Sequence, residues 1–405
     1  MADAARDVFI YGALRSPRGR ARQTGALYEV PPHRLVAQLL RALAARLGFD
    51  PAEVTDLLLG CVTPVADQGY NIAQAALLAA DWPATVAGAQ VNRFCASGLE
   101  SVHAAAARVA AGYDELLVAG GVESMSRVPL GSDGGPLLTD PELLLSSGSI
   151  PQGVAADLIA TDRGLARERL DAFALESQRR AAAAWEGGHF AESVVPITDD
   201  NGLVLLSRDE HPRPDTDAEK LAALAPAFAA VGATGFDDIA LGRFPHLPRI
   251  EHRHTAGNSS GLVDGAALAL LGSAGAGERL GLAPRARLRS VAVASSDATM
   301  MLLGMIPATE RALARAGLSI GEVDLVEVNE AFAAVPLAFV DHFGVDAERV
   351  NVNGGAIALG HPVGATGAIL LGTLVDELER RGARTGLVTL CAGGGQGIAA
   401  VVERA

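Results

Sequence analysis

Lysine is almost missing from this sequence. Lys220 is the single lysine among 405 residues, and nearly all of the positive charge is carried by arginine. A P-loop needs a lysine after its glycine-rich loop, and Schiff-base and pyridoxal enzymes need one in the site. Lys220 lies in "DAEKLAALA", a polar helical pattern, so the sequence argues against these classes. Any bound phosphate is expected to contact arginines, backbone N–H groups or helix ends.

Cysteines, long apolar runs and net positive charge are also scarce. Cys61, Cys95 and Cys391 form an odd, widely spaced set, which argues against a disulfide framework and favours a reducing compartment, the cytoplasm. No apolar run reaches the roughly 18 residues of a membrane helix, and the N-terminal segment lacks the basic region of a secretory signal. The formal net charge of −14 makes nucleic acid an unfavourable partner. We therefore expect neither nucleic-acid binding nor membrane insertion.

Short apolar runs alternate with Ala- and Leu-rich stretches of helical period. This alternation is typical of an α/β fold, in which helices cover a mostly parallel sheet. The length suits two or three domains. The predicted strands are 7–14, 56–62, 115–122, 288–295, 324–332 and 385–394, and the predicted helices lie near 33–47, 97–111, 307–317 and 364–381.

Two parts of the sequence repeat the same order of elements. "DLLLGCV", "VNRFCASG", a helix and "ELLVAGGVES" are matched later by "DLVEVNEAF", "VNVNGGAIALG", a helix and "LVTLCAGGG". The repeat predicts a duplicated α/β core. Residues 127–254 are richer in Pro, Asp, Gly and Arg and interrupt it. We expect an N-terminal half of 1–126 plus 255–284, an inserted loop subdomain at 127–254, and a C-terminal half at 285–405.

Cys95 stands between an extended segment and a helical pattern in "VNRFCASGLES". One interpretation is a small buried core residue, which is common for free cysteine. The other is a nucleophile, because the partial positive charge of a helix N-terminus lowers the pKa of a thiol and favours the thiolate. Cys61 lies in an apolar strand, and we expect it to be a core residue. The local sequence leaves both interpretations open for Cys95.

Two glycine-rich segments in the C-terminal part carry further reactive side chains. In "NGGAIALGHPVGATG" (353–367), His361 lies among five glycines. It can be interpreted as a general base for a thiol or as a hydrogen-bonded loop residue. In "LCAGGGQG" (390–397), Cys391 ends a predicted strand, and the glycines offer N–H donors suited to an oxyanion hole. "GQGIAA" matches a dinucleotide fingerprint formally, but we expect no helix or strand after it, which excludes that use.

Polar residues at a strand end and in one loop complete the candidates. Asn329 and Glu330 end a buried strand, so they are either hydrogen-bonded core residues or site residues. The segment 254–271 places small polar residues before a predicted apolar helix, consistent with backbone contacts to a phosphate or pantetheine. The "HRH" at 252–254 lacks a third ligand at suitable spacing, so we predict no metal site.

Together these segments resemble the thiolase family. "NRFCASGLES", "AGGVESMS", "NEAFA", "NVNGGAIALGHPVGATG" and "CAGGGQG" are similar to its signature segments and occur in the family's order over nearly the whole chain. The resemblance implies the thiolase fold, a duplicated βαβαβαββ core in five layers, α-β-α-β-α. "DQGYNIAQAA", "SMSRVPLGSDGG" and "GNSSGLVDGAAL" look most like the degradative type, the 3-ketoacyl-CoA thiolase of fatty-acid β-oxidation, as in the β-subunit of bacterial fatty-acid-oxidation complexes.

The resemblance implies an acyltransferase with ping-pong kinetics. Cys95 would attack the 3-keto carbonyl of a 3-ketoacyl-CoA while His361 takes the thiol proton, and Cys391 would protonate the leaving acetyl-CoA enolate. Free CoA would then thiolyse the acyl-Cys95 intermediate. One oxyanion would be held by His361 and a water on Asn329, the other by the N–H groups of Cys95 and Gly393. CoA is then a substrate, and no permanent cofactor or metal is implied.

The resemblance also assigns residues to CoA. They are Ser260 and Ala256 at pantetheine, Phe228 at adenine, Arg213 at a phosphate, and Ala331 and Phe332 at the pantetheine end. Biosynthetic thiolases carry His-Met-Gly where this chain reads "PQG" (151–153), which disfavours acetoacetyl-CoA synthesis. An extra segment, 229–250, puts the Phe228 and Arg213 assignments in question. That segment could shape an acyl tunnel or a subunit interface.

Partners and competing functions follow from the same resemblance. Acyl-CoA and CoA are the expected small-molecule partners, the chain is expected to form a homodimer or homotetramer, and a hydratase/dehydrogenase α-subunit is a further candidate partner. The alternatives are an acetoacetyl-CoA-forming biosynthetic thiolase, a non-catalytic acyl-CoA- or lipid-binding protein, and a decarboxylating ketoacyl synthase. Intact Cys95, His361 and Asn329 argue against the binding protein, and Cys391 argues against the synthase. The sequence does not fix acyl chain length or reaction direction.

Overall fold

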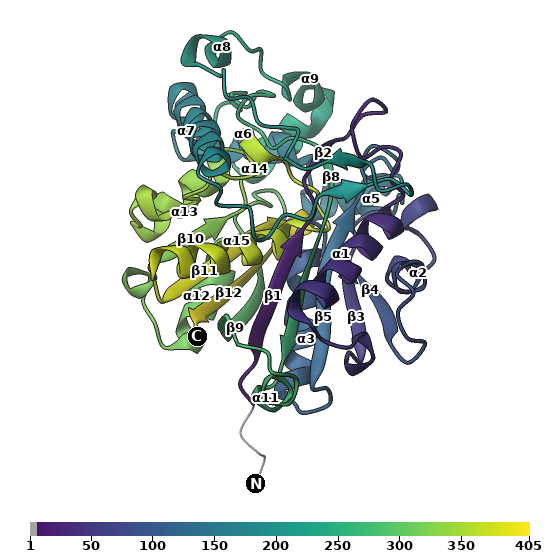
Figure 1. The fold of residues 1–405 in the computed structure, drawn as a ribbon. Coiled ribbons are helices and arrows are strands. Elements are labelled where there is room, and N and C mark those ends of the chain that lie inside the picture. The colour runs from purple at the N-terminus through teal and green to yellow at the C-terminus, as the bar shows by residue number, and fades with distance from the viewer. Residues whose placement is uncertain (1–5) are drawn as a thin grey trace.

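The computed structural model describes residues 6–405, which fold around one large sheet (Figure 1). Its strand order is β10-β11-β12-β9-β1-β8-β5-β3-β4, with β2 paired to β8, while β6 and β7 form a separate hairpin. The strands are β1 (Phe9–Arg15), β2 (Gly19–Arg20), β3 (Asp56–Gly60), β4 (Ala87–Val91), β5 (Leu116–Glu123), β6 (Ile197–Thr198), β7 (Val204–Leu206), β8 (Val263–Gly272), β9 (Ala286–Ser295), β10 (Leu325–Val328), β11 (Thr385–Ala392) and β12 (Gln396–Arg404).

The helices surround this sheet and cap one of its ends. They are α1 (Pro32–Leu47), α2 (Ile72–Ala79), α3 (Ser97–Ala110), α4 (Pro136–Thr139), α5 (Pro141–Ser147), α6 (Gln152–Asp162), α7 (Arg167–Glu186), α8 (Ala218–Ala222), α9 (Ala229–Val231), α10 (Asp237–Arg243), α11 (Ala274–Leu280), α12 (Met305–Ala316), α13 (Ala334–Phe343), α14 (Ala356–Leu359) and α15 (Thr366–Arg381). Glycines in the left-handed conformation end several of them; Gly48 after α1 has a φ of 72° and Gly382 after α15 has a φ of 64°.

The two halves of the sheet repeat one another. In the N-terminal half β3 and β5 are parallel, and β8 and β1 follow as antiparallel neighbours. In the C-terminal half β10 and β11 are parallel, and β12 and β9 follow as antiparallel neighbours. β1 and β9 join the halves through only two paired positions, Phe9 with Arg287 and Ile10 with Ala286. This arrangement is the duplicated core that the sequence repeat predicted.

The expectation of a mostly parallel sheet is wrong. Parallel pairing is limited to β3–β4, β3–β5 and β10–β11, and the remaining pairs are antiparallel. The error lies in β8 and β12: residues 263–271 were expected to be helical, and no strand was expected after "GQGIAA". β8 is Ala- and Leu-rich and buried at every position, so it lacks the two-residue alternation that marks a half-exposed strand.

Five layers are built from these elements, which confirms the predicted thiolase-type architecture. α3 and α15 form the middle layer, and one apolar cluster there unites both halves, including Leu99, Leu117, Leu374 and Leu390. α1 and α2 cover the outer face of the N-terminal half, and α12 covers the outer face of the C-terminal half (Figure 1). The carboxyl ends of the parallel strands lie at one end of the sheet, where α/β proteins place their ligands.

The residues between β5 and β8 cover that end of the sheet. Figure 1 shows α6 to α9 above it, opposite the N-terminus. Within this region Pro141–Asp162 is long and apolar enough for a membrane span, although no such run was expected. It is divided into α5, in which no residue is buried, and α6, most of which is buried in the core. In its most apolar window, 61% of the residues are buried in the molecule.

Candidate active site

Cys95 lies in a tight turn between β4 and α3. Phe94, just before it, has a φ of 48°, a left-handed conformation that is uncommon outside glycine and often marks functional sites. The Ser97 hydroxyl fixes the turn, because it accepts the Arg93 N–H at 2.9 Å and donates to the Phe94 carbonyl at 2.6 Å. Cys95 packs in a small apolar cluster with Val62. The turn thus presents the thiol just ahead of α3.

Three polar groups near Cys95 lower the pKa of its thiol. They are the Gln152 side chain at the start of α6, the backbone N–H of Cys95 itself and the backbone N–H of Gly393. Burial nevertheless raises the pKa of the Cys95 thiol to about 11, and the three donors only partly offset it. The expected lowering of this pKa by the helix N-terminus is therefore wrong for the resting protein, since the desolvation of a buried sulfur outweighs the helix end.

His361 is held in one tautomer by the residues that follow it. The Thr366 hydroxyl donates its proton to the Pro362 carbonyl at 2.9 Å, so its oxygen accepts from His361 Nδ1 at 2.6 Å. Nε2 then carries a lone pair, and the Asn329 amide Nδ2 lies 3.3 Å from it. The ring is buried, and its Nε2 is the unprotonated nitrogen that a general base requires.

The surroundings of His361 keep it neutral. Burial, and secondarily the Arg18 guanidinium, lower the pKa of His361 to about 3. Arg18 is itself buried and donates to the Gly360 carbonyl at 3.1 Å, directly before the histidine. The Asn329 Oδ1 atom is buried and has no hydrogen-bond partner among the described residues. An unpaired buried acceptor is costly, and it suits a group that orders a water or a substrate donor.

Cys391 meets Cys95 from the other half of the molecule. It is the penultimate residue of β11 and is buried. Burial raises the pKa of its thiol, and negative charge on Cys95 raises it further. Gly393 follows at the strand end, and a Cβ atom there would lie 3.0 Å from the Phe94 ring. The structure places Asn329 beside His361, Gly393 beside Phe94, and Cys95 in one apolar cluster with Val363, two residues after His361. Cys95, His361, Asn329, Cys391 and Gly393 were all predicted as site residues from the sequence.

The predicted pantetheine residues lie beside this centre. Ser260 N–H donates to the Ala331 carbonyl at 2.9 Å, and Ser259 forms a bridge with Phe332. The next residue, Gly261, accepts the backbone N–H of His361 at 2.8 Å. The loop before β8 is therefore bonded to both the strand end that carries Asn329 and the loop that carries His361.

A cleft at the surface leads to this loop. Arg213 and Ala256, two of the predicted CoA residues, line it, and so do His211 and Lys220, which the sequence analysis did not assign. Phe228 is elsewhere: its ring lies 5.7 Å from the Phe332 ring, centroid to centroid, and a Cβ atom on Gly153 would lie 2.2 Å from it. It packs beside the start of α6, next to the residue that faces Cys95, and not among the residues lining the cleft.

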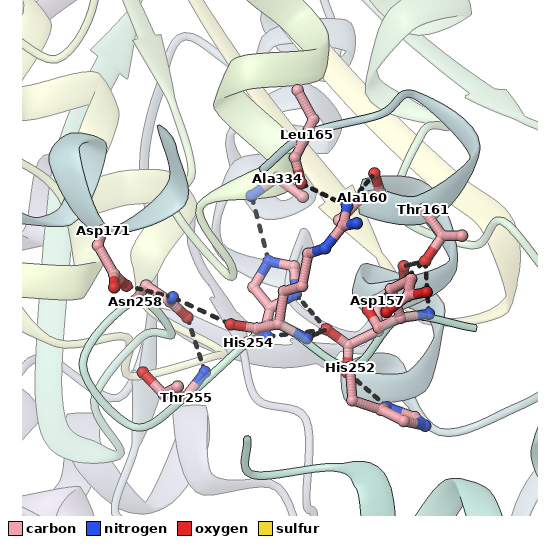
Figure 2. A network of polar contacts seen from close by, with 12 residues as sticks. Asp157, Ala160, Thr161, Leu165, Asp171, His252, His254, Thr255, Asn258 and Ala334 are labelled. Carbon is pink, nitrogen blue, oxygen red and sulfur yellow. Dashed lines mark hydrogen bonds and ion pairs between the residues drawn. The ribbon is translucent and has the colours of Figure 1, made fainter. Parts of the chain in front are cut away.

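The "HRH" segment anchors the same loop through a buried carboxylate. Figure 2 shows Asp157 of α6 accepting from His252 Nδ1 at 2.8 Å and from His254 Nδ1 at 2.7 Å. His252 Nε2 reaches Asp237 at 3.0 Å, so both ring nitrogens face carboxylates. Burial would lower the pKa of His252, but the two carboxylates outweigh it and raise that pKa. Asn258 continues the network by donating to Asp171 at 2.7 Å.

These histidines therefore have structural partners. Residues 6–405 contain no group of three or more His, Cys, Asp or Glu side chains arranged to hold a metal ion. The network also ties Asp237, which belongs to the extra segment 229–250, to α6 and the pantetheine loop. One consequence is that the extra segment is fastened to the loop for which pantetheine contacts were predicted.

Sequence reasoning missed three residues that shape the reactive centre. Gln152 was noted only as part of "PQG", and nothing local marks its approach to Cys95. Thr366 was within the glycine-rich segment, and its spacing of five residues from His361 was an available signal. Arg18 lies far away in the sequence and reaches His361 only because β1 ends at the same edge of the sheet as β5.

Comparison with known proteins identifies relatives over the whole chain. The family model "Thiolase, N-terminal domain" matches residues 8–239, and "Thiolase, C-terminal domain" matches residues 282–404. A 3-ketoacyl-CoA thiolase of Acinetobacter baylyi is 42% identical over 404 residues, 98% of each chain. One from Shewanella frigidimarina is 41% identical over the same share. The crystal structure of an acetyl-CoA acetyltransferase from Bacillus anthracis superimposes with a TM-score of 0.86, at 37% identity and 100% coverage of both chains.

Proposed function

The chain belongs to the thiolase family, and from this premise we propose that it is a 3-ketoacyl-CoA thiolase. The reaction is the thiolytic cleavage of a 3-ketoacyl-CoA by CoA, which yields acetyl-CoA and an acyl-CoA shortened by two carbons. CoA is a substrate in this reaction. The chemistry is reversible, and the direction depends on concentrations.

The first half-reaction forms an acyl-enzyme on Cys95. His361 Nε2 accepts the thiol proton as the sulfur attacks the 3-keto carbonyl, and the oxyanion forms among the N–H groups of Cys95 and Gly393. The Cα–Cβ bond then breaks, and its electron pair leaves as the acetyl-CoA enolate. Cys391 supplies the proton to that carbanion. His361 and the Asn329 amide face the thioester oxygen on which enolate charge develops.

The second half-reaction returns the enzyme to its starting state. Free CoA enters after acetyl-CoA leaves, and Cys391 recovers a proton from the CoA thiol. The CoA sulfur attacks the acyl-Cys95 carbonyl, the same two N–H groups hold the oxyanion, and the Cys95–acyl bond breaks. The departing Cys95 sulfur takes back the proton stored on His361, so protons balance over the cycle.

One observation supports this proposal: the buried Cys95 thiol packs in one apolar cluster with Val363, two residues after His361, whose tautomer leaves Nε2 unprotonated. Because the pKa of Cys95 lies near 11 and that of His361 near 3, the resting pair is an uncharged thiol and imidazole. The charged pair is then formed only while the carbonyl is attacked, when the two N–H donors act on the developing oxyanion.

The test is an assay of purified protein with 3-ketoacyl-CoA substrates of four to sixteen carbons. Formation of acetyl-CoA that requires both the 3-ketoacyl-CoA and free CoA supports the proposal. A binding protein without catalysis would give no acetyl-CoA at any chain length. Consumption of a malonyl thioester with release of carbon dioxide would instead indicate a decarboxylating synthase.

A second candidate function is acetoacetyl-CoA formation from two acetyl-CoA molecules. It is favoured by the likeness to the Bacillus anthracis acetyl-CoA acetyltransferase. Gln152, at the position of the methionine in the biosynthetic motif, argues for the degradative assignment. A kcat/KM that is highest for acetoacetyl-CoA and falls for longer substrates would reverse the order of the two candidates.

We also infer a homo-oligomer in the cytoplasm. β4 is the terminal strand of the sheet, so its outer edge leaves backbone donors and acceptors available for a second copy. Cys61, Cys95 and Cys391 are all free thiols, which suits a reducing compartment. Light scattering after size-exclusion chromatography tests the assembly: a mass of about 41.5 kDa would mean a monomer and would contradict the inference.

A further inference from the structure

A single buried carboxylate joins parts of the site that come from the two halves of the chain. Glu123 is the last residue of β5 and has no exposed surface. Its oxygens accept the backbone N–H groups of Val62 at 2.9 Å, Thr63 at 3.1 Å and Gly364 at 3.0 Å, and the Gln68 amide at 2.7 Å. Three of these donors belong to the N-terminal half, and Gly364 belongs to the C-terminal half.

The two halves of the chain make direct backbone contacts around the hydrogen bond between the Gly364 N–H and Glu123. The Gly364 carbonyl oxygen would lie 1.9 Å from a Cβ atom on Gly121 and 2.7 Å from one on Gly98. A Cβ atom on Gly367 would lie 2.4 Å from the Leu99 nitrogen. Only glycine permits such contacts, so the starts of α3 and α15 are pressed together without side chains between them. The bond from Gly364 to Glu123 fixes this contact from one side.

Each arm of the Glu123 cluster ends near a reacting residue. Val62 packs in the same apolar cluster as Cys95. Gly364 lies three residues after His361 and two before Thr366, which sets the histidine tautomer. We propose that Glu123 is a positioning residue that holds the Cys95 turn and the His361 loop in register for proton transfer. This proposal rests on the proposed thiolase function wherever it is tested by the rate of Cys95 acylation.

The groups around Glu123 fit an ionised carboxylate. All its close partners are donors, and Gln68 is oriented by the Ser124 N–H, which donates to the Gln68 carbonyl oxygen at 2.6 Å. Burial raises the pKa of Glu123 to about 7, while the four donors lower it. The titratable groups that face it are Cys61 and Cys95, and its negative charge raises the pKa of both thiols. Glu123 therefore has two effects: it positions the Cys95 turn and the His361 loop, and its negative charge raises the pKa of the Cys95 thiol.

Glu123→Gln tests both effects at once. The amide places an N–H₂ group against backbone donors, so the Cys95 turn and the His361 loop move apart. We expect the rate of Cys95 acylation by a 3-ketoacyl-CoA to fall about 100-fold, as for a misplacement near 1 Å. Because the negative charge is removed, the midpoint of the pH profile for Cys95 alkylation by iodoacetamide should move to lower pH. The midpoint is read only on protein that circular dichroism shows to be folded, because unfolding exposes Cys95 and would also lower it.

Two further variants act as controls. Glu330→Gln changes a buried carboxylate that binds Ser177, Asn351 and Ile357, all outside the Cys95 turn, so the Cys95 alkylation midpoint should stay where it is. Glu123→Asp keeps the charge but withdraws it by one methylene, so acylation should slow while the alkylation midpoint stays near that of the wild type.

The proposal is overturned if folded Glu123→Gln acylates Cys95 within threefold of the wild-type rate, or if its alkylation midpoint does not move. If Glu123→Gln does not fold, Gln68→Ala and Glu123→Asp decide the question, and wild-type kcat in both would contradict the proposal. Alkylation needs no turnover. A wild type without thiolysis therefore refutes the proposed function alone, whereas an unmoved midpoint refutes the Glu123 role alone.

Discussion

Cys61 and Cys95 are two buried cysteines of the same half of the molecule, and their surroundings are opposite. The Cys61 sulfur lies 3.9 Å from a carboxylate oxygen of Glu123, an acceptor that disfavours a thiolate. Around Cys95 the Gln152 amide and two backbone N–H groups instead favour the thiolate and lower the pKa of the thiol. Burial raises the pKa of both thiols, and that of Cys61 is raised further. What separates a nucleophile from a core residue here is the polarity of the partners, not the degree of burial.

The largest expected effect comes from removing the Cys95 sulfur, and Cys61 is the comparison. Cys95→Ala should abolish both half-reactions, because no acyl-enzyme can form. Cys61→Ala should leave kcat near the wild-type value and cost about 1 kcal/mol of the free energy of unfolding, as is common for a small buried side chain. Steady-state assays and urea unfolding of both variants check this. Equal loss of turnover in the two would erase the contrast between these cysteines.

Cys391 extends the comparison to the second half. Cys391→Ala should lower kcat about 100- to 10,000-fold, the usual contribution of a general acid or base. The variant should still be acylated on Cys95 by an activated thioester such as a nitrophenyl thioester, since that step needs no proton from Cys391. Rapid-quench mass spectrometry measures it. Loss of acylation in step with turnover would contradict the separation of roles.

Thiol alkylation compares all three cysteines in the native protein. The rate of alkylation rises with pH as the thiolate fraction grows, and Cys95, with a pKa near 11, should reach half of its maximum at lower pH than Cys61 and Cys391. At pH 9 we expect Cys95 to react more than tenfold faster than the other two. Peptide mapping after iodoacetamide treatment reports each site. Faster labelling of Cys61 would mean that the donors around Cys95 have no effect.

The tautomer of His361 is expected to contribute less to kcat than the two reactive cysteines do. Thr366→Val removes the acceptor of His361 Nδ1, and a buried hydrogen bond of this kind contributes about 1–1.5 kcal/mol, so kcat should fall about tenfold. Thr389→Val is the matched control, because Thr389 is equally buried and donates to the Ile398 carbonyl at 2.9 Å, away from His361. The tautomer argument fails if the two variants lose the same activity.

The smallest expected effect lies in the outer cleft. Arg213 is exposed, so an ion pair with a CoA phosphate is screened by water, and Arg213→Ala should raise the KM for CoA only about 2- to 10-fold with kcat unchanged. Arg34→Ala, on α1 and paired with Asp200, serves as the control. An unchanged KM in Arg213→Ala would remove this arginine from the CoA site.

The reactive residues were predictable because their motifs are contiguous. Cys95, His361 and Cys391 each lie in a short segment whose glycines and strand ends are visible in the sequence, and the alternation of elements located most strands and helices. β8 was not predictable in the same way, because a strand buried on both faces has the composition of a buried helix.

Two features of the site depended on the assembled fold. The sign of the Cys95 pKa shift is set by desolvation, and the local sequence shows only the favourable helix end. Gln152 and Glu123 act on Cys95 and on the His361 loop from segments that are distant in the chain, and no local pattern indicates that these segments meet. Sequence reasoning found the groups that react, and the structure adds the groups that hold them.

Trapping the acyl-enzyme tests the central claim most directly. The protein is mixed with a 3-ketoacyl-CoA in the absence of free CoA, quenched in acid, digested with trypsin and analysed by mass spectrometry. The three cysteines fall in separate tryptic peptides, 47–93, 94–108 and 385–404. We predict the acyl mass on peptide 94–108, at Cys95, with release on addition of CoA. An acyl group on peptide 47–93 or 385–404, or turnover without any acylated peptide, would contradict the account.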